Sequence, residues 1–533
     1  MTQTSLSHPR ARSPKRRLRR AGALGVSCLV SLFGVALPAA AAGATGASRT
    51  LRLAFTQIDQ SPDPAIWYGG LGNPVELGLY EGLTKYGQNN GNVEPDLATS
   101  WTISPDGLTY TFHLRRGVTF HDGTPFNSAA AMYSWQRDIK IASAPEYMLT
   151  DVKSMDAPDP MTFVVHLKTR NSAFLDYQAS PYAPKFVSPT TVKAHLGKDD
   201  GQTWLATHDA GTGPYVLTSL SPTTGYVMQS YPKYWGHKPY YTTVDINIVP
   251  NETTEELELQ RGQLDMVTDG LSAQDLAKFS HESNLREWEF PAIDEMYVAM
   301  NPTRNNILSD PAIRRAVDRA INKKLIVAQT YGPAARVSSS FYPFGELPEG
   351  LGQDTQSYDP SVLQKLLSKT HLSKHIVIAE ISGGGVTSQV SELIQAELQA
   401  DGVDATIRTY TGVVYNALPQ HPRDQPDMVV VASNPDDSSP AAWAQTYFLH
   451  KAPLNTVSLN VPAADAAINA GLQSTSPERV TADYVRAAKD YMAAGEVFPI
   501  ADVNSSVVAQ ASIKHIVHDV ADPYGIVLDE AAP

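Results

Sequence analysis

The sequence has 533 residues and a net charge of −13, with 42% hydrophobic and 18% charged residues. This composition is that of a globular protein and excludes an intrinsically disordered chain. The length is too great for one compact core and indicates about two to four domains. An acidic chain repels phosphate backbones, which argues against nucleic acid as a partner.

The N-terminal segment has the order of residues that is typical of a secretory signal peptide. Seven basic residues and no acid precede an apolar stretch from Ala21 to Leu37, and small residues follow Pro38. We predict a signal peptide over residues 1–42, cleaved near Ala42. The alternative is an uncleaved membrane anchor, although the apolar stretch is short for a bilayer span. Without this leader the net charge is −20, from 35 Lys and Arg against 55 Asp and Glu.

The single cysteine, Cys28, lies inside the predicted signal peptide. The mature chain would then contain no disulfide and no thiolate chemistry. Cys28 could alternatively be a lipid-attachment site, but Gly25 stands where such a site favours leucine. We therefore expect an exported protein, periplasmic or extracellular, without a lipid anchor.

The first part of the mature chain is predicted to be rich in β-structure. Apolar residues alternate in Thr50–Phe55, Thr109–Leu114 and Met161–Leu167, a period typical of strands with one buried face. Turn sequences rich in Pro, Asp and Gly precede the second and third strands, at residues 104–107 and 157–160.

A helical period replaces this alternation further along the chain. Asp310 can cap a helix that has Pro311 at its first position. The apolar residues that follow fall on one helical face, and Gly332 can end the element. One helix is therefore predicted over this segment.

A strand, helix and strand follow one another between residues 376 and 407. The strands are predicted over 376–381 and 403–407, and the helix between them ends at Asp401-Gly402. This order predicts a βαβ unit in a parallel or mixed sheet covered by helices. A β-rich part followed by an α/β part indicates at least two lobes, and a cleft between lobes is a common ligand site.

Eight segments in order along the mature chain resemble family 5 of the extracellular solute-binding proteins, the peptide and oligopeptide class. The most specific is TYTFHLRRGVTFHDGTPF at residues 109–126. The others are YEGL at 80–83, VEPDLA with Trp101 at 93–101, GTGPY at 211–215, YWG with KP at 234–239, LQRGQLD at 259–265, Asn301 with the segment 310–322, and YDP at 358–360.

The resemblance implies an α/β, two-lobed, three-domain periplasmic-binding-protein-like fold with a ligand cleft between the lobes. The implied domains are a discontinuous domain I (48–88, 209–295 and 493–533), a β-rich domain II (89–208) and an α/β domain III (296–492). Hinges are expected near Tyr297 and near Phe498-Pro499, where the chain crosses between lobes.

The resemblance also implies a function, the extracytoplasmic substrate-binding protein of an ABC importer. Such a protein captures peptides or peptide-like solutes by lobe closure and delivers them to a membrane permease. A non-peptide solute (an oligosaccharide, an opine-like compound or a metal chelate) is an alternative, and an exported hydrolase is a weaker one. We expect a monomer that is not an enzyme and has no cofactor.

The residues themselves agree with the absence of an enzymatic site. No Gly-x-Ser-x-Gly elbow occurs, and His281-Glu282 lacks a second histidine at metalloprotease spacing. His121-Asp122 is interpreted as part of a turn, and residues 382–385 (SGGG) as a βα turn, although backbone amides there could hold an anion. No metal site is predicted.

The segment Asp427–Phe448 carries the main candidate for ligand binding. It aligns without a gap to a family pattern in which an acid receives the ligand's α-ammonium, and Asp436 falls on that acid. Ala432 and Ser433 replace the usual Gly-Trp of the pattern, which predicts a roomier and more polar pocket. On a shifted register Asp436 would be a structural acid and Ser433 would take the anchor position.

Three aromatic residues complete the predicted site. Trp67 and Tyr68 follow the first strand, and Tyr297 lies near the expected crossing between lobes. Aromatic side chains offer a large contact area at low entropic cost, which suits binding pockets. The alternative for each is packing in the hydrophobic core.

Overall fold

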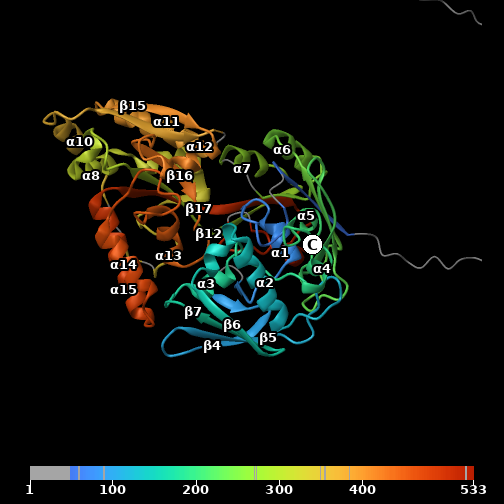
Figure 1. Ribbon diagram of the computed structural model, residues 1–533. Helices are drawn as coiled ribbons and strands as arrows, with labels where there is room; N and C mark the ends of the chain where they lie inside the picture. The colour runs from blue at the N-terminus through green and yellow to red at the C-terminus, as the bar shows by residue number, and fades with distance from the viewer. Residues whose placement is uncertain are drawn as a thin grey trace, which may run out of the picture. The chain divides into compact units, whose positions relative to one another are not determined.

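The structure is a computed structural model, in which residues 48–533 form one compact unit (Figure 1). It describes residues 49–57, 61–87, 91–268, 271, 273–348, 350–352, 356–382, 385–522 and 525–533. The predicted signal peptide and Cys28 lie outside the described residues. Within the described part, no helix has both the length and the apolar character that crossing a membrane requires.

The first sheet of the unit holds the N-terminal strand against a later β-hairpin. Strand β1 pairs in parallel with β10, and the other neighbours in the sheet are antiparallel. The strand order is β1 (Thr50–Phe55), β10 (Thr243–Ile248), β9 (Gly225–Ser230) and β8 (Tyr215–Ser221). The alternating residues Leu51, Leu53 and Phe55 are all buried, as the sequence predicts.

A second, fully antiparallel sheet forms the predicted β-rich region. Its strand order is β4 (Ala98–Ile103), β5 (Thr109–Leu114), β7 (Thr162–Leu167) and β6 (Val152–Asp159). Trp135 on helix α2 (Ser128–Ile141) packs edge-on against Phe163 of β7, so the helix covers one face of the sheet. A short ribbon, β2 (Thr84–Tyr86) with β3 (Val93–Pro95), leads into this region.

The largest sheet has seven strands and joins segments from distant parts of the sequence. Its order is β11 (Met266–Val267), β17 (Val497–Gln510), β12 (Leu285–Met300), β16 (Met428–Ser433), β14 (His375–Ile381) and β15 (Asp404–Tyr410), with β13 (Ala335–Val337) on β17. Strands β14 and β15 are parallel and flank helix α11 (Val386–Ala400), so the predicted βαβ unit is present.

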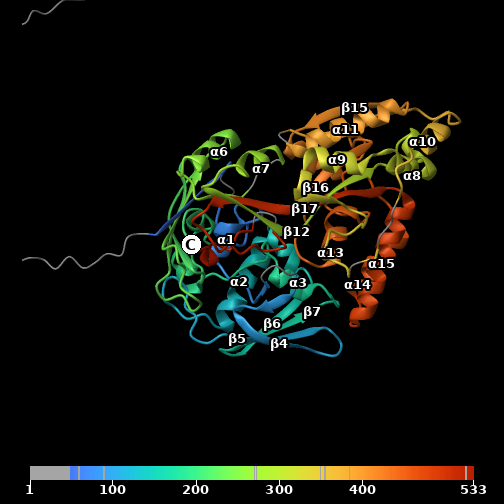
Figure 2. The same cartoon turned by 180° about the vertical axis from the view of Figure 1, so that it is seen from behind.

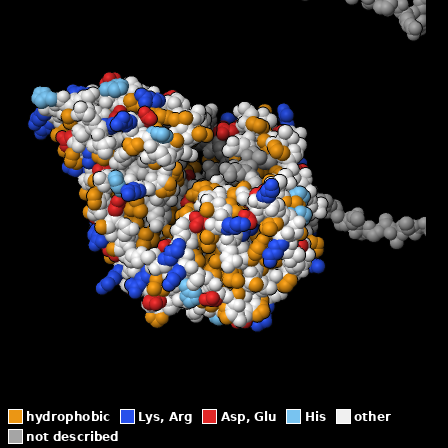
Figure 3. Space-filling model, in the orientation of Figure 1, with side chains coloured by type: hydrophobic (Ala, Val, Ile, Leu, Met, Phe, Trp, Pro, Cys, Tyr) orange, Lys and Arg blue, Asp and Glu red, His pale blue; other side chains and the backbone are white. Residues whose placement is uncertain are grey.

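The long antiparallel pair β12 and β17 links two parts of the unit. Both views show it running from the part with α6 and α7 to the part with α8 and α15 (Figures 1 and 2). Its register shifts between Met296 and Tyr297, where Tyr297 faces Pro499. The expected hinge positions therefore lie in this pair at an irregular point of its ladder. The face in Figure 3 is hollowed between the part with α11 and β15 and the part with α6.

The other helices surround these sheets. They are α1 (Asn73–Leu79), α3 (Phe174–Ala179), α4 (Pro189–Ala194), α5 (Gln202–Leu205), α6 (Glu252–Gln260), α7 (Ala273–Phe279), α8 (Pro311–Ala320), α9 (Lys323–Thr330), α10 (Pro360–Leu367), α12 (Gly412–Ala417), α13 (Pro440–Trp443), α14 (Pro462–Leu472) and α15 (Pro477–Ala494).

The prediction of one helix from Asp310 to Gly332 is wrong. Asp310 caps α8 by accepting a bond from the Ala312 amide, but the chain is extended at Ile321 (φ −92°, ψ 124°). Asn322 then caps a second helix, α9, because its side chain accepts a bond from the Leu325 amide. A capping side chain inside an apolar period ends one helix and begins another.

Candidate functional site

Asp436 lies in the loop between β16 and α13 and is almost fully buried, with 7% of its surface exposed. Its Oδ2 atom accepts hydrogen bonds from the hydroxyls of Tyr68 (2.5 Å) and Tyr147 (2.6 Å). Its backbone carbonyl accepts a bond from Ser180 Oγ. The loop is thus fixed by side chains that are more than 250 residues away in sequence.

Within the described part of the chain, Asp436 has hydrogen-bond donors but no basic partner. No ion pair to Asp436 occurs among the described residues. Burial raises the pKa of its carboxyl group, and the bonds from Tyr147 and Tyr68 partly oppose that rise. Burial beside this acid also raises the pKa of both phenols, so the tyrosines stay protonated as donors. Burial thus disfavours the charged form of Asp436, and a cation beside the group would stabilise its carboxylate.

The neighbouring acid, Asp437, has a different position. It is completely buried, and its Oδ1 atom accepts a bond from the Ser439 amide (2.8 Å). Ser439 in turn caps helix α13. Asp437 therefore organises the start of this helix, whereas Asp436 faces a cavity.

The cavity beside Asp436 has a volume of about 480 Å3. Its walls come from the segment after β1, from the β-rich region and from the α/β region. The described lining residues are Tyr68, Ala144, Tyr147, Thr150, Asp151, Tyr177, Asp436, Gln445, Thr446, Pro453 and Leu454. This is an ordinary size for a small-ligand site, and most of the lining is aromatic or aliphatic.

Two predicted site residues, Ala432 and Ser433, lie at the end of β16 and do not contribute to this lining. Ala432 pairs with Met296 across the sheet and its side chain is exposed. Ser433 is half-buried, and its hydroxyl is hydrogen-bonded to the hydroxyl of Tyr447. Of the three predicted residues in this segment, Asp436 lines the cavity and Ala432 and Ser433 do not.

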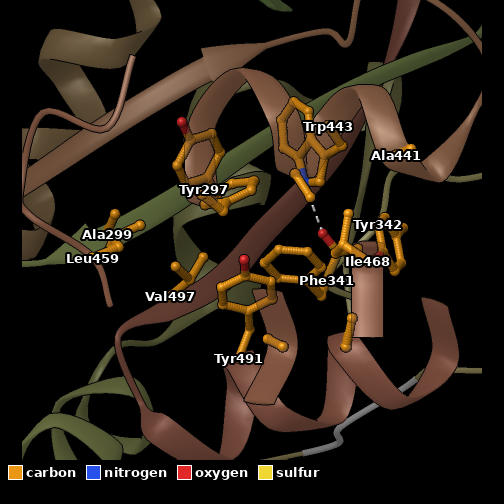
Figure 4. Close-up of a cluster of buried hydrophobic side chains, with 14 of the residues drawn as sticks. Tyr297, Ala299, Phe341, Tyr342, Ala441, Trp443, Leu459, Ile468, Tyr491 and Val497 are labelled. Atoms are coloured by element: carbon orange, nitrogen blue, oxygen red, sulfur yellow. Dashed lines mark hydrogen bonds between the residues drawn. The ribbon is translucent and has the colours of Figure 1, made fainter. Parts of the chain in front are cut away.

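Tyr68 is the predicted aromatic residue that reaches the cavity. Trp67, its neighbour, is buried, and its Nε1 atom donates to Asn73 Oδ1 at 3.0 Å. Tyr297 is buried in an aromatic cluster, where its ring contacts those of Trp443 and Phe448. Figure 4 shows Tyr297 and Trp443 in this cluster. Core packing, the alternative interpretation, describes the positions of Trp67 and Tyr297.

Several lining residues were not predicted, above all Tyr147 and Tyr177. Tyr177 donates to Gln445 Oε1 at 2.6 Å and so connects the β-rich region to the α/β region. Neither tyrosine belongs to a periodic pattern or to a quoted family motif, so the sequence carries no signal for them. Gln445 lies inside the family segment at residues 427–448, which could have indicated it.

The other candidates from the sequence have contacts that indicate a structural role. His121 contacts Asp209 and the Gly213 carbonyl, while Asp122 Oδ1 accepts a bond from the Thr124 amide (2.8 Å), as expected of a turn. The glycine turn at 382–385 lies partly outside the described residues.

One group of side chains that could ligate a metal ion occurs in the described part of the chain. His237, Asp529 and Glu530 offer ligand atoms within 4.8 Å of one another. His237 is exposed, and its Nε2 atom is already 3.0 Å from the Asp529 carbonyl oxygen. None of the three lines the Asp436 cavity.

Comparison with known proteins identifies the family. The profile of the bacterial extracellular solute-binding proteins, family 5, matches residues 92–454, more than half of the chain. The chain belongs to this family. Family 5 proteins are binding proteins, which confirms the prediction of a non-enzymatic function.

Relatives of this family 5 protein are named for different ligands. It is 26% identical over 351 residues to the nickel-binding periplasmic protein of Escherichia coli (62% of this chain, 65% of the relative). It is 30% identical over 262 residues to a probable D,D-dipeptide-binding periplasmic protein of the same organism (48% and 50%). The matches thus span between half and about two thirds of these relatives.

The fold comparison covers nearly the whole chain. A Helicobacter pylori periplasmic binding protein, DppA, solved in complex with the peptide STSA, superposes with a TM-score of 0.77 at 22% identity. The superposition covers 91% of this chain and 98% of the other. The predicted α/β binding-protein fold is therefore confirmed.

Proposed function

We propose that this family 5 protein is the solute-binding component of an ABC importer and captures peptides or peptide-like amines on Asp436. The observation that carries the proposal is a buried acid, Asp436, that has no basic partner among the described residues and lies at the wall of a cavity of about 480 Å3. A ligand ammonium group would supply the missing cation through a charge-assisted hydrogen bond.

The surrounding side chains support a ligand with both polar and apolar groups. Tyr68 and Tyr147 hold one oxygen of Asp436, which orients the carboxylate. Pro453 and Leu454 offer apolar contact, whereas Gln445 and Thr446 offer hydrogen bonds. The described lining contains no His or Cys, and this composition favours an amine over a directly coordinated metal ion.

Capture would require two states of the chain. We propose that the β12 and β17 pair is the link about which the two lobes move, with hinges near Tyr297 and Phe498-Pro499. The Tyr177 to Gln445 bond and the Ser180 to Asp436 bond would form on closure, because each joins the β-rich region to the α/β region. Ligand shifts this equilibrium only if it binds the closed state more tightly.

A thermal-shift screen of residues 43–533 tests the proposal. The panel contains di- to pentapeptides, oligosaccharides, amino-acid–sugar conjugates and chelated metals, each with the unsubstituted protein and with Asp436→Ala. A ligand at a hundred times its Kd stabilises the protein by about 2.7 kcal/mol. Peptide shifts that disappear in the variant support capture on Asp436. Shifts from sugars or chelates alone, equal in both proteins, would keep the carrier and reject the peptide ligand and the anchor.

A further inference from the structure

The charged side chains in the described lining of the cavity are all acidic. Its described lining includes two carboxylates, Asp436 and Asp151, and no Lys, Arg or His. Lys168 contacts the lining through a bond from its Nζ to the Thr150 carbonyl (2.7 Å), but its side chain is exposed and is not part of the wall. The residues between 49 and 533 that the structure does not describe include no Lys, Arg or His either.

Asp151 contributes negative charge without being a second anchor. Its Oδ1 atom accepts a bond from Thr169 Oγ1 (3.0 Å), and its Oδ2 atom accepts one from Asn171 Nδ2 (2.9 Å). Both oxygens therefore have neutral partners, and the charge of the group is not cancelled. The potential inside the cavity is negative at both of its acids.

A ligand carboxylate inside this cavity would have no cationic partner. It would lose its hydration and would also be repelled by Asp436 and Asp151, a combination that buried charges do not tolerate. An ammonium group meets the opposite situation at Asp436. A zwitterionic short peptide would therefore gain binding free energy at its ammonium end and lose it at its carboxylate end.

We propose that the cavity selects ligands with a net positive charge: amines with an apolar body whose carboxyl group is absent, amidated or esterified. The inference rests on the proposed function and adds the ligand class. The apolar body would lie on the side chains of Ala144, Tyr147, Tyr177, Pro453 and Leu454.

Isothermal titration calorimetry with three matched probes tests this selection. The probes are Leu-Leu, Leu-Leu-amide and N-acetyl-Leu-Leu-amide, which carry both charges, the ammonium alone and neither. We expect the amide to bind at least about tenfold more tightly than the free peptide, a difference of about 1.4 kcal/mol. The acetylated probe should bind weakest.

A substitution in the wall provides a second test. Leu454 is half-buried in the lining, so Leu454→Arg would place a cation in the cavity, and Leu454→Gln is the neutral control of similar polarity. The arginine variant should reverse the preference toward Leu-Leu. The glutamine variant, which also loses the apolar contact of Leu454, should bind both probes more weakly and still bind the amide more tightly than the free peptide.

The outcomes separate the two proposals. Equal or tighter binding of free Leu-Leu by the unsubstituted protein would overturn the selection for cations and leave the proposed capture of peptides on Asp436 intact. Tightest binding of the acetylated probe, or no binding of any probe, would overturn the ammonium anchor and the inference with it.

Discussion

Asp436→Asn separates the charge of the anchor from its shape. The amide oxygen of asparagine can still accept bonds from the hydroxyls of Tyr68 and Tyr147, so the loop should keep its position. The lost interaction is one charge-assisted hydrogen bond to the ligand ammonium, worth about 1.5–3 kcal/mol. The Kd for an amine such as Leu-Leu-amide should therefore rise by about 10- to 150-fold.

The same substitution should make the ligand-free protein more stable, although it weakens ligand binding. Burial raises the pKa of the Asp436 carboxyl group above its value in the unfolded chain, about 3.9. The folded state therefore binds this proton more tightly, and the wild type loses stability as the pH rises from the unfolded pKa through the folded pKa. The asparagine variant does not undergo this loss of stability. Its free energy of unfolding should therefore exceed that of the wild type by little near pH 4 and by more at pH 7.

Urea unfolding between pH 4.5 and 7.5, together with calorimetry at pH 7, measures both effects. Asp424→Asn is the matched control, because Asp424 is an exposed acid shortly before β16 and should change neither quantity. A variant that is less stable than the wild type at pH 7 and binds the amine equally well would refute the reasoning. Asp436 would then be a structural acid.

Three further substitutions test the packing that positions the site. Arg137→Ala leaves the fully buried Asp63 without its ion pair and should cost about 3–5 kcal/mol in urea unfolding; a loss below about 1 kcal/mol would contradict this. Trp443→Ala should cost a similar 3–5 kcal/mol, seen as a lower Tm, because the side chain is fully buried. Gly225→Ala should prevent folding, since its Cβ would lie 1.8 Å from a backbone carbonyl oxygen of β10, whereas Gly412→Ala, with open space around it and no left-handed φ, should give folded protein of normal yield.

The predictions from sequence were most accurate where local patterns decide the structure. The alternation in Thr50–Phe55 and Thr109–Leu114 corresponds to strands β1 and β5 with the same bounds. The predicted helix from Asp310 failed because an amphipathic period alone does not distinguish one helix from two, and the cap at Asn322 interrupts it. Local capping chemistry was visible in the sequence but competed with the stronger apolar period.

The sequence by itself determined the family and the fold class, because ordered motifs and local periods depend on neighbouring residues, and it predicted Asp436 as the ligand anchor. Only the tertiary structure decided what surrounds that acid. Tyr68 and Tyr147 are 368 and 289 residues away from it, and no local pattern marks either contact. Contacts between residues that are far apart in sequence also decided that Tyr297 packs in the core and that no described basic side chain lines the cavity. These are properties of how the sheets and helices meet, and they set the charge of the cavity wall.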